Sequence, residues 1–259
     1  MTMSKSMPHI DHKTIVIKLG GSILGDLNSS FFEKVQKYIK SGYQVVIVHG
    51  GGPAINASLE KNNIAYKKVN GIRFTSKEAV KIVQHALIEE VNPYLTKQLN
   101  SAGISSIGLN GIDSSIFESD FLDQSVYGYV GEIQKVHLST IQQYFDAGKV
   151  PVIACFGATK DGIPLNINGD TVASDIALAI KADALLLVTD TPGIRINNEV
   201  QQEVNPEIIR NWIETKDIYG GMIPKVQAAI ACLEEGIPAI HIVDQKFQGT
   251  KITKEGVLL

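Results

Sequence analysis

The stretch VIVHGGGPAI, residues 46–55, joins a run of apolar, β-branched residues to an expected helix through three consecutive glycines. Glycine loses more conformational freedom on folding than any other residue, so we expect something to approach this backbone more closely than a Cβ permits. A second turn of this kind, KLGGS at 18–22, ends the apolar run TIVIKLG at 14–20. In an open α/β sheet, ligands bind outside the carboxyl ends of the strands, where both turns would lie.

Short apolar runs alternate with longer amphipathic segments along the chain. This alternation predicts an α/β fold, a three-layer αβα sandwich around an open, mostly parallel central sheet. Asn70-Gly71 within KKVNGIRFT, residues 67–75, predicts an added β-hairpin, and VYGYVGEIQKV at 126–136 predicts further paired β structure. The expected strands are 14–20, 43–50, 104–111, 150–157, 184–190 and 238–243, and the expected helices are 29–41, 53–62, 76–100, 170–181 and 222–235.

Composition excludes several classes of protein. The net charge of −3 and the lack of a Lys/Arg stripe argue against nucleic-acid binding. No apolar run approaches the roughly 18–20 residues needed to span a bilayer, and the polar start lacks the apolar region of a signal peptide. The only cysteines, Cys155 and Cys232, form no CxxC motif. We therefore expect a cytoplasmic protein with buried, reduced thiols, no membrane contact and no nucleic-acid partner.

The glycine turns and two lysines favour a phosphate site. Exposed N–H groups in such turns, and at the helix start after Pro53, attract anions, although each turn could also be a plain strand-to-helix connection. No GxxxxGK[ST] is present, and HGGGP is not GxGxxG, so neither a P-loop nor a dehydrogenase is predicted. Lys18 ends a buried run, where a charge is costly unless paired, and Lys225 falls early in an expected helix, where a cation opposes the helix dipole. A phosphate partner accounts for both; each alone could be a surface lysine.

The glycine turns belong to a longer series of motifs that resembles the amino-acid kinase family. The resemblance covers nearly the whole chain from about Lys13, in the family's order. NGIRFT and NINGD make it specific to the branch that phosphorylates the side-chain carboxylate of N-acetyl-L-glutamate in arginine biosynthesis. The motifs are KLGGS (18–22), HGGGP (49–53), NGIRFT (70–75), NINGD (166–170), VTDTPGI (188–194), GGMIPK (220–225) and GT (249–250).

The resemblance implies a kinase that uses ATP with Mg²⁺ and forms an acyl phosphate. A carboxylate acceptor, with a reference pKa of about 4.3, is already ionised at neutral pH, so no general base is needed. Catalysis then consists of positioning and charge neutralisation. We expect no dedicated protein ligands for Mg²⁺, which phosphate oxygens and water can hold.

The resemblance also assigns roles to individual residues. Lys18 and Lys225 would stabilise the transition state, and Asp170 would orient both; from spacing alone Asp170 could equally be a helix N-cap. Gly51, Gly52, Arg73 and Asn166 would bind the acetylated amino acid, although Arg73 could be an exposed strand residue and Asn166 a turn residue. The nucleotide would contact Gly20, Gly21, Asp190, Thr191, Pro192, Gly193, Ile194, Arg195, Asp217, Ile218 and Tyr219.

Domain organisation, acceptor and assembly follow from the same series. We expect one domain over 1–259, with an N-terminal lobe of about 13–165 for the acceptor and a C-terminal lobe of about 166–259 for the nucleotide. Two alternatives remain: a kinase for another N-blocked acidic amino acid, such as an aminoadipate, and a nucleotide or amino-acid sensor without catalysis. The long helix expected at 76–100 favours a homodimer. Arginine-inhibited members of the family carry an additional N-terminal helix, and the short segment before the first strand leads us to expect no such inhibition.

Overall fold

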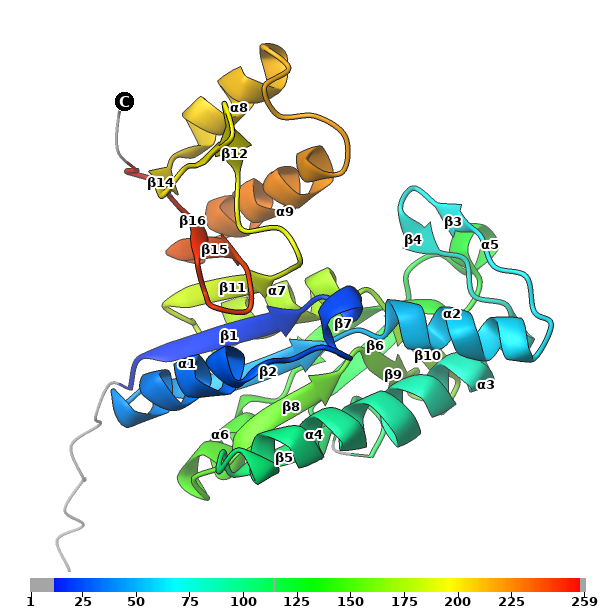
Figure 1. The fold of residues 1–259 in the computed structure, drawn as a ribbon. Helices are drawn as coiled ribbons and strands as arrows, with labels where there is room; N and C mark the ends of the chain where they lie inside the picture. Colours follow the sequence, from blue (N-terminus) through cyan, green and yellow to red (C-terminus); the bar gives the residue numbers. More distant parts are fainter. Residues whose placement is uncertain (1–11, 114, 257–259) are drawn as a thin grey trace, which may run out of the picture.

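One eight-stranded sheet forms the centre of the computed structural model, which describes residues 12–113 and 115–256 (Figure 1). All neighbouring strands of this sheet run parallel except one antiparallel pair at 239–243 and 249–253. The predicted open, mostly parallel sheet is therefore confirmed. In spatial order its strands are β14 (Glu203–Val204), β16 (Gly249–Thr253), β15 (Ala239–Val243), β11 (Ala184–Val188), β1 (Thr14–Leu19), β2 (Gln44–His49), β8 (Val150–Ala154) and β5 (Ser106–Leu109).

Helices cover both faces of the sheet, which confirms the three-layer architecture (Figure 1). The alternation along β1 sends Ile15, Ile17 and Leu19 into the core beneath α1 and α4, and Val16 into the core beneath α7 and α9. Lys18 shares the face of Val16. The helices are η1 (Gly21–Ile23), α1 (Ser29–Lys40), α2 (Gly52–Lys61), α3 (Lys77–Gln84), η2 (His85–Val91), α4 (Asn92–Ser101), α5 (Gln124–Tyr127), α6 (Leu138–Asp146), α7 (Gly169–Ala179), α8 (Pro206–Glu214) and α9 (Met222–Glu234).

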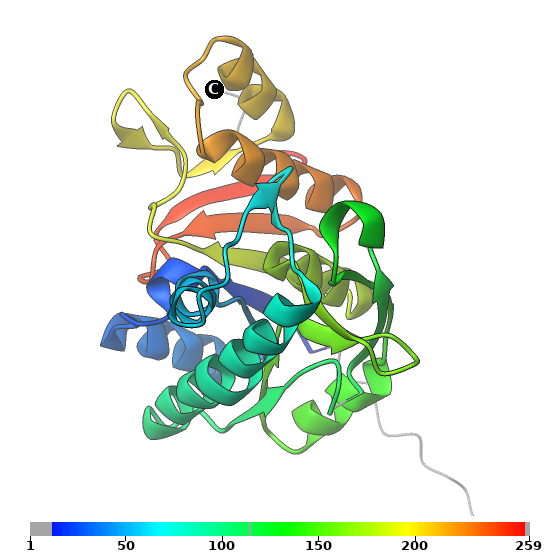
Figure 2. The ribbon, with the colours of Figure 1, turned by 90° about the vertical axis from the view of Figure 1, so that its right-hand side faces the viewer.

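Smaller β elements decorate the central sheet. The predicted hairpin forms between β3 and β4, and both turn residues, Asn70 (φ 51°) and Gly71 (φ 81°), have the left-handed conformation that a tight hairpin needs. In Figure 2 this hairpin projects upward in front of α9, and Figure 1 shows the two elements apart. The remaining strands form a four-stranded sheet and a second hairpin. They are β3 (Lys68–Val69), β4 (Ile72–Arg73), β6 (Phe117–Phe121), β7 (Val130–Val136), β9 (Phe156–Ala158), β10 (Pro164–Ile167), β12 (Arg195–Ile196) and β13 (Glu199–Val200).

Three helices differ from the sequence-based expectation. The helices α6 and α8 were not predicted, although both are amphipathic, each burying one residue fully (Ile141 and Ile209), and α8 begins with an Asn205 cap followed by Pro206. The β structure expected at 126–136 begins only at Val130. Before it, the Asp123 carboxylate accepts the N–H groups of Ser125 and Val126 and so starts the short helix α5.

The long helix expected at 76–100 is present as the continuous series α3, η2 and α4. Its middle part, η2, is π-helical, and the N–H of Asn92 bonds to the carbonyl of Leu87, five residues earlier. No helix in the described part of the chain combines the length and apolarity of a membrane span. The residues 1–11, which bear on the expected lack of arginine inhibition, lie outside the described ranges.

Candidate active site

Lys18 and Asp170 form the most enclosed charged pair at the carboxyl edge of the sheet. Lys18 Nζ lies 2.8 Å from Asp170 Oδ1, and the Lys18 side chain is 18% exposed. The pair forms because α7 begins directly over the ends of β1 and β2: a Cβ placed on Gly169 would lie 3.6 Å from Lys18 Cε and 3.7 Å from the Gly50 nitrogen. Asn168 caps this helix by accepting the Asp170 N–H. The ion pair thus gives the partly buried ammonium group its compensating charge.

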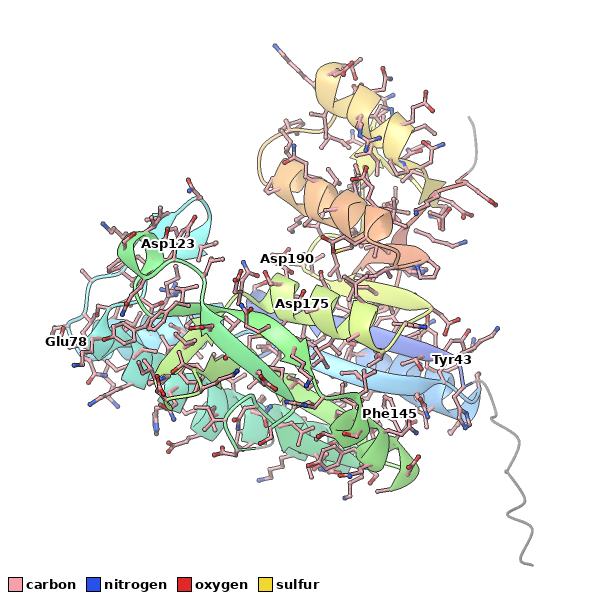
Figure 3. The ribbon with its side chains drawn as sticks, turned by 180° about the vertical axis from the view of Figure 1, so that it is seen from behind. Tyr43, Glu78, Asp123, Phe145, Asp175 and Asp190 are labelled. Carbon is pink, nitrogen blue, oxygen red and sulfur yellow. The ribbon has the colours of Figure 1, made fainter. Side chains whose placement is uncertain are left out.

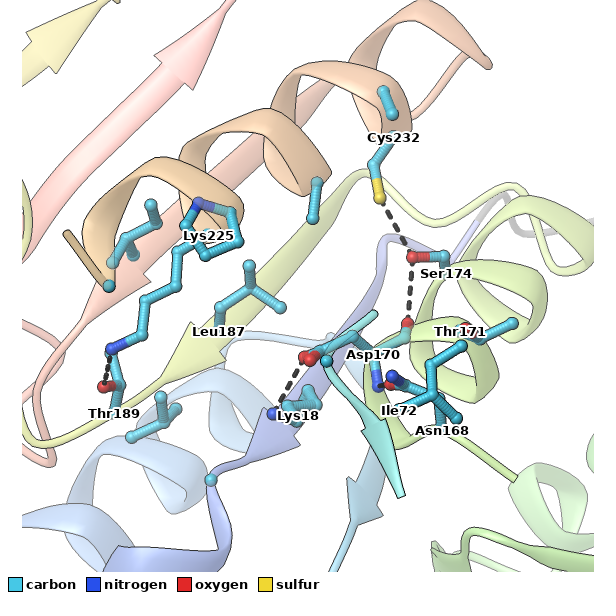
Figure 4. A pocket seen from close by; sticks show the side chains of 18 of the residues that line it. Lys18, Ile72, Asn168, Asp170, Thr171, Ser174, Leu187, Thr189, Lys225 and Cys232 are labelled. Carbon is cyan, nitrogen blue, oxygen red and sulfur yellow. Dashed lines mark hydrogen bonds and ion pairs between the residues drawn. The ribbon is translucent and has the colours of Figure 1, made fainter. Parts of the chain in front are cut away.

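Lys225 approaches the same region from the first turn of α9. Its Nζ donates a 3.0 Å hydrogen bond to Thr189 Oγ1 and lies 4.0 Å from Asp190 Oδ1, just beyond the end of β11 (Figure 4). The hydrogen bond from Thr189, more than the nearby Lys225, lowers the pKa of Asp190. The structure therefore joins Asp170 to Lys18, whereas the partners of Lys225 are Thr189 and Asp190.

Both lysines line one cavity of about 800 Å³, within the usual size of small-molecule sites. In Figure 4 the two lysines lie on opposite sides of Leu187, one on β1 and the other on α9. The tip of the β3–β4 hairpin, at Asn70 and Gly71, also lines this cavity. A second cavity, of about 410 Å³, adjoins the first because Gly221 and Lys225 line both.

The residues predicted for the nucleotide divide between these two cavities and their surroundings. Gly20 and Asp190 line the larger cavity. Gly21 and Pro192 line neither. The smaller cavity is lined by Thr191, Gly193, Ile194, Arg195, Asp217, Ile218 and Tyr219.

The glycines of the two turns prove to have different structural roles. A Cβ on Gly21 would lie 2.7 Å from the nitrogen of Gly52 and 2.9 Å from Pro53 Cδ, so the two turns pack directly on each other. A Cβ on Gly51 would lie 2.7 Å from Leu87 Cδ2, whereas one on Gly52 would meet nothing within 4 Å. The missing side chains at Gly21 and Gly51 therefore serve close packing, whereas Gly50 and Gly52 leave open space.

Arg73 and Asn166 lie together at the base of the β3–β4 hairpin, outside both cavities. Thr75 links them: its hydroxyl accepts a 3.2 Å hydrogen bond from Asn166 Nδ2 and donates one of 3.1 Å to the Arg73 carbonyl. Arg73 Nη2 donates to Asn56, and its guanidinium carbon lies 4.7 Å from the centre of the Tyr66 ring. Arg73 Nη1 is buried and has no hydrogen-bond partner among the residues that the structure describes. An orphaned buried donor of this kind is suited to an acceptor supplied by a ligand.

Other titratable groups near the site suit packing better than chemistry. His49 is fully buried, which lowers its pKa to about 4, as expected for a packed residue at a strand end. Both cysteines are free and buried, as predicted, and burial raises the pKa of Cys155 to about 12. Among the described residues, no three His, Cys, Asp or Glu side chains gather in a way that could hold a metal ion.

Sequence reasoning missed several residues that line the larger cavity. Thr189 and Asn168 sit beside predicted residues, and their polar side chains at a strand end and a helix start were an available signal. Asp175, on α7, had no such signal. Glu235 and Cys232 line the cavity from the end of α9. Nothing in the local sequence places them near the other cavity residues.

The comparisons with known proteins agree with this arrangement. A model of the Amino acid kinase family matches residues 13–244. The chain is 41% identical to a protein named acetylglutamate kinase from Geobacillus sp. (strain WCH70) over 90% of this chain and 91% of that one, and 40% identical to one from Bacillus pumilus over 94% and 97%.

Solved structures show the same fold. A Streptococcus mutans UA159 protein superimposes with a TM-score of 0.84 at 36% identity, over 93% of this chain and 98% of that one. A Giardia lamblia carbamate kinase bound to AMP-PNP shares the fold at a TM-score of 0.65 and 18% identity, over 94% of this chain and 99% of that one. The motifs, the sheet, the family match and these relatives lead to one conclusion: the chain belongs to the amino acid kinase family.

Proposed function

We propose that this protein transfers the γ-phosphoryl group of ATP to the side-chain carboxylate of N-acetyl-L-glutamate, forming an acyl phosphate for arginine biosynthesis. The observation that carries the proposal is the placement of Lys18 and Lys225 on opposite walls of one cavity, which adjoins a second cavity through Lys225. Relatives named acetylglutamate kinase, about 40% identical over most of the chain, support this acceptor.

The two lysines and the backbone donors would neutralise charge during the transfer. Two anions, a carboxylate and a triphosphate, must be brought together, and the migrating phosphoryl group carries charge on its oxygens. Lys18, held by Asp170 at 2.8 Å, is directed before any substrate binds. The N-terminus of α7 adds a partial positive charge beside it. Lys225 would act from the nucleotide side, where Thr189 holds its ammonium group.

The acceptor would bind on the side of the β3–β4 hairpin. Arg73 has one buried donor without a partner in residues 12–113 and 115–256, and a guanidinium group suits the bidentate binding of an α-carboxylate. Asn166, held through Thr75, would bind the same molecule near Gly51 and Gly52. Residues of about 13–165 would thus form the acceptor lobe of a single domain and 166–259 the nucleotide lobe. The two lobes differ only in the ligand that they would bind. They share one sheet, because β1 of the first lobe pairs with β11 of the second.

The nucleotide would occupy the smaller cavity and place its phosphates near Gly20, Gly21 and Lys225. Tyr219, at 76% exposed, lines that cavity and offers a ring face to a base. ATP would arrive as its magnesium complex, since the phosphate oxygens and water can satisfy this ion without a cluster of protein ligands. We propose in addition a cytoplasmic homodimer joined through the long helix of α3, η2 and α4, on which Tyr94 is 47% exposed.

The acceptor can be tested by trapping the acyl phosphate with hydroxylamine. We expect ATP-dependent hydroxamate formation with acetylglutamate and much less with acetylaspartate or acetylaminoadipate, each compared at matched concentration. Preference for acetylaminoadipate would reassign the acceptor. ATP binding without hydroxamate from any of the three would indicate a sensor and overturn the proposed reaction.

A further inference from the structure

A buried hydrogen-bond chain lies directly behind the glycine turn of residues 50–52. His49 is completely buried and Asn92 is 6% exposed. Asn92 Nδ2 lies 2.9 Å from His49 Nε2 and 2.9 Å from the carbonyl oxygen of Val152. On the other side of the ring, His49 Nδ1 lies 2.9 Å from the carbonyl oxygen of Gly50. The proposed reaction mechanism assigns no role to this series of hydrogen bonds.

The donors and acceptors of the chain allow one consistent assignment. The amide of Asn92 has two N–H donors, and the Val152 carbonyl accepts one of them. The second donor faces His49 Nε2, which must therefore be unprotonated. His49 Nδ1 then carries the proton and donates it to the Gly50 carbonyl. Turning the amide over would place two oxygens against each other at Val152. Burial lowers the pKa of His49 to about 4, so the ring stays neutral.

The long helix is shaped to reach this point. The π-helical segment η2 ends at Val91, and the N–H of the next residue, Asn92, bonds to the carbonyl of Leu87. Leu87 packs on Gly51 and Asn92 bonds to His49, so one stretch of helix contacts both the turn and the residue before it. A bulge of this type is frequent at functional sites. On strand β5, Gly108 has no side chain because a Cβ there would overlap Asn92 Oδ1.

We propose that Asn92 is a positioning residue for phosphoryl transfer: it fixes the Nδ1–H tautomer of His49, which in turn fixes the peptide between Gly50 and Gly51. The peptide is planar, so a carbonyl held by His49 also fixes the direction of the Gly51 N–H. That N–H belongs to the turn that faces the transferred group under the proposed function, on which this inference rests. The hydrogen bond from His49 would thus hold the peptide between Gly50 and Gly51 in one orientation, where a free glycine turn could rotate.

The tautomer can be read directly in the wild-type protein. Nitrogen-15 NMR of labelled histidines, with His49 assigned from the spectrum of His49→Gln, distinguishes a protonated Nδ1 from a protonated Nε2. We expect His49 to carry its proton on Nδ1 and to show no titration between about pH 5 and 8. A proton on Nε2 would overturn the proposal, whether or not the protein is active.

Two variants disturb Asn92 in different ways. Asn92→Asp keeps the shape but removes both donors, and we expect a proton on His49 Nε2. Gly108→Ala displaces the Asn92 side chain from the neighbouring strand and leaves every proposed catalytic group intact. Because a misplaced donor weakens transition-state stabilisation, we expect kcat for hydroxamate formation to fall about 10- to 100-fold in both, with little change in KM for ATP.

The matched control is Asn100→Ala on the same helix. Asn100 also bridges to the sheet, through Ser106, but it does not touch His49 or the glycine turn. We expect it to lower stability while leaving kcat and the His49 tautomer unchanged. If Asn92→Asp and Gly108→Ala lose stability but keep wild-type kcat, as Asn100→Ala would, the positioning role is wrong. A wild-type protein that forms no hydroxamate would instead refute the proposed reaction, while the tautomer measurement would stand.

Discussion

The two lysines of the cavity have the same charge but very different surroundings. The Lys18 side chain is 18% exposed, lies on a central strand and contacts Asp170 at 2.8 Å. The Lys225 side chain is 41% exposed, extends from the first turn of a helix and lies 4.0 Å from Asp190. The β1 side of the cavity is therefore packed and held in place, whereas the α9 side is more open to water. An ionic interaction is stronger where water is excluded, so Lys18 should contribute more to the same reaction.

The glycines repeat this contrast. A Cβ on Gly21 or Gly51 would meet another group at 2.7 Å, but a Cβ on Gly220 or Gly221, before α9, would meet nothing within 4 Å. The glycine turns that follow β1 and β2 are therefore tightly packed. The glycine pair before α9 leaves free space around the start of that helix.

Replacing each lysine by methionine gives the largest expected effect and tests the contrast directly. We expect kcat to fall about 10³-fold in Lys18→Met and about 10²-fold in Lys225→Met, because the more enclosed cation stabilises the transition state more. KM for ATP should change much less than kcat in both. Steady-state kinetics of hydroxamate formation measure these values.

A matched control separates this effect from the loss of any lysine. Lys251 forms a 2.8 Å ion pair with Glu203 at the sheet edge and lines neither of the two site cavities. Lys251→Met should retain near-normal kcat, since such exposed pairs contribute little. A larger loss in Lys225→Met than in Lys18→Met would reverse the comparison.

Adding a methyl group to one glycine after β1 and to one before α9 gives the next effect. Gly21→Ala forces the backbone of Gly52 to move, so we expect the free energy of unfolding to fall by about 2 kcal/mol and kcat to fall with it. Gly221→Ala has open space and a φ of −68°, so its stability should stay within about 0.5 kcal/mol of the wild type. Urea denaturation of both variants provides the measurement. If Gly21→Ala lost no more stability than Gly221→Ala, the close contact between Gly21 and Gly52 could be relieved without cost.

The sequence predicted the central sheet, the β3–β4 hairpin and most of the large helices, because each has a strong local signal. Buried parallel strands have continuous apolar runs, and Asn70-Gly71 favours only a few turn types. The helices α6 and α8 were missed although both are amphipathic and α8 has local start signals in Asn205 and Pro206. The pairing of Lys18 with Asp170 followed from the family resemblance. No local signal joins two residues so far apart in the chain.

The reason for the glycine run at 50–52 could not be obtained from the sequence. Flexible residues suggested room for a ligand, and that explanation fits Gly52, where a Cβ would meet nothing within 4 Å. Gly51 is instead required by Leu87, which the π-helical segment η2 brings onto it. The contact depends on a helical irregularity and on a residue 36 positions away, and neither has a local sequence pattern.

The smallest expected effect concerns Asp175, which projects from α7 and lines the larger cavity (Figure 3). Burial, with the nearby charges of Glu235 and Glu132, raises its pKa from 3.8 to about 6. The folded protein then binds a proton more tightly than the unfolded chain. Between about pH 4 and 6 the stability contributed by this group therefore falls as pH rises, and the charged carboxylate destabilises the fold at neutral pH.

Asp175→Asn removes that charge without changing the shape of the side chain. A shift of this size corresponds to at most about 3 kcal/mol, and because Asp175 is only half-buried we expect a gain of about 1 kcal/mol at pH 7. At pH 4 most of this gain should be lost, because Asp175 is then protonated in the folded protein and about half protonated in the unfolded chain. Asp161→Asn, at an exposed aspartate, is the matched control, and its stability at pH 7 should stay within about 0.5 kcal/mol of the wild type. If the difference persisted at pH 4, packing rather than charge at Asp175 would be its cause, and this acidic end of the cavity would not weaken the fold.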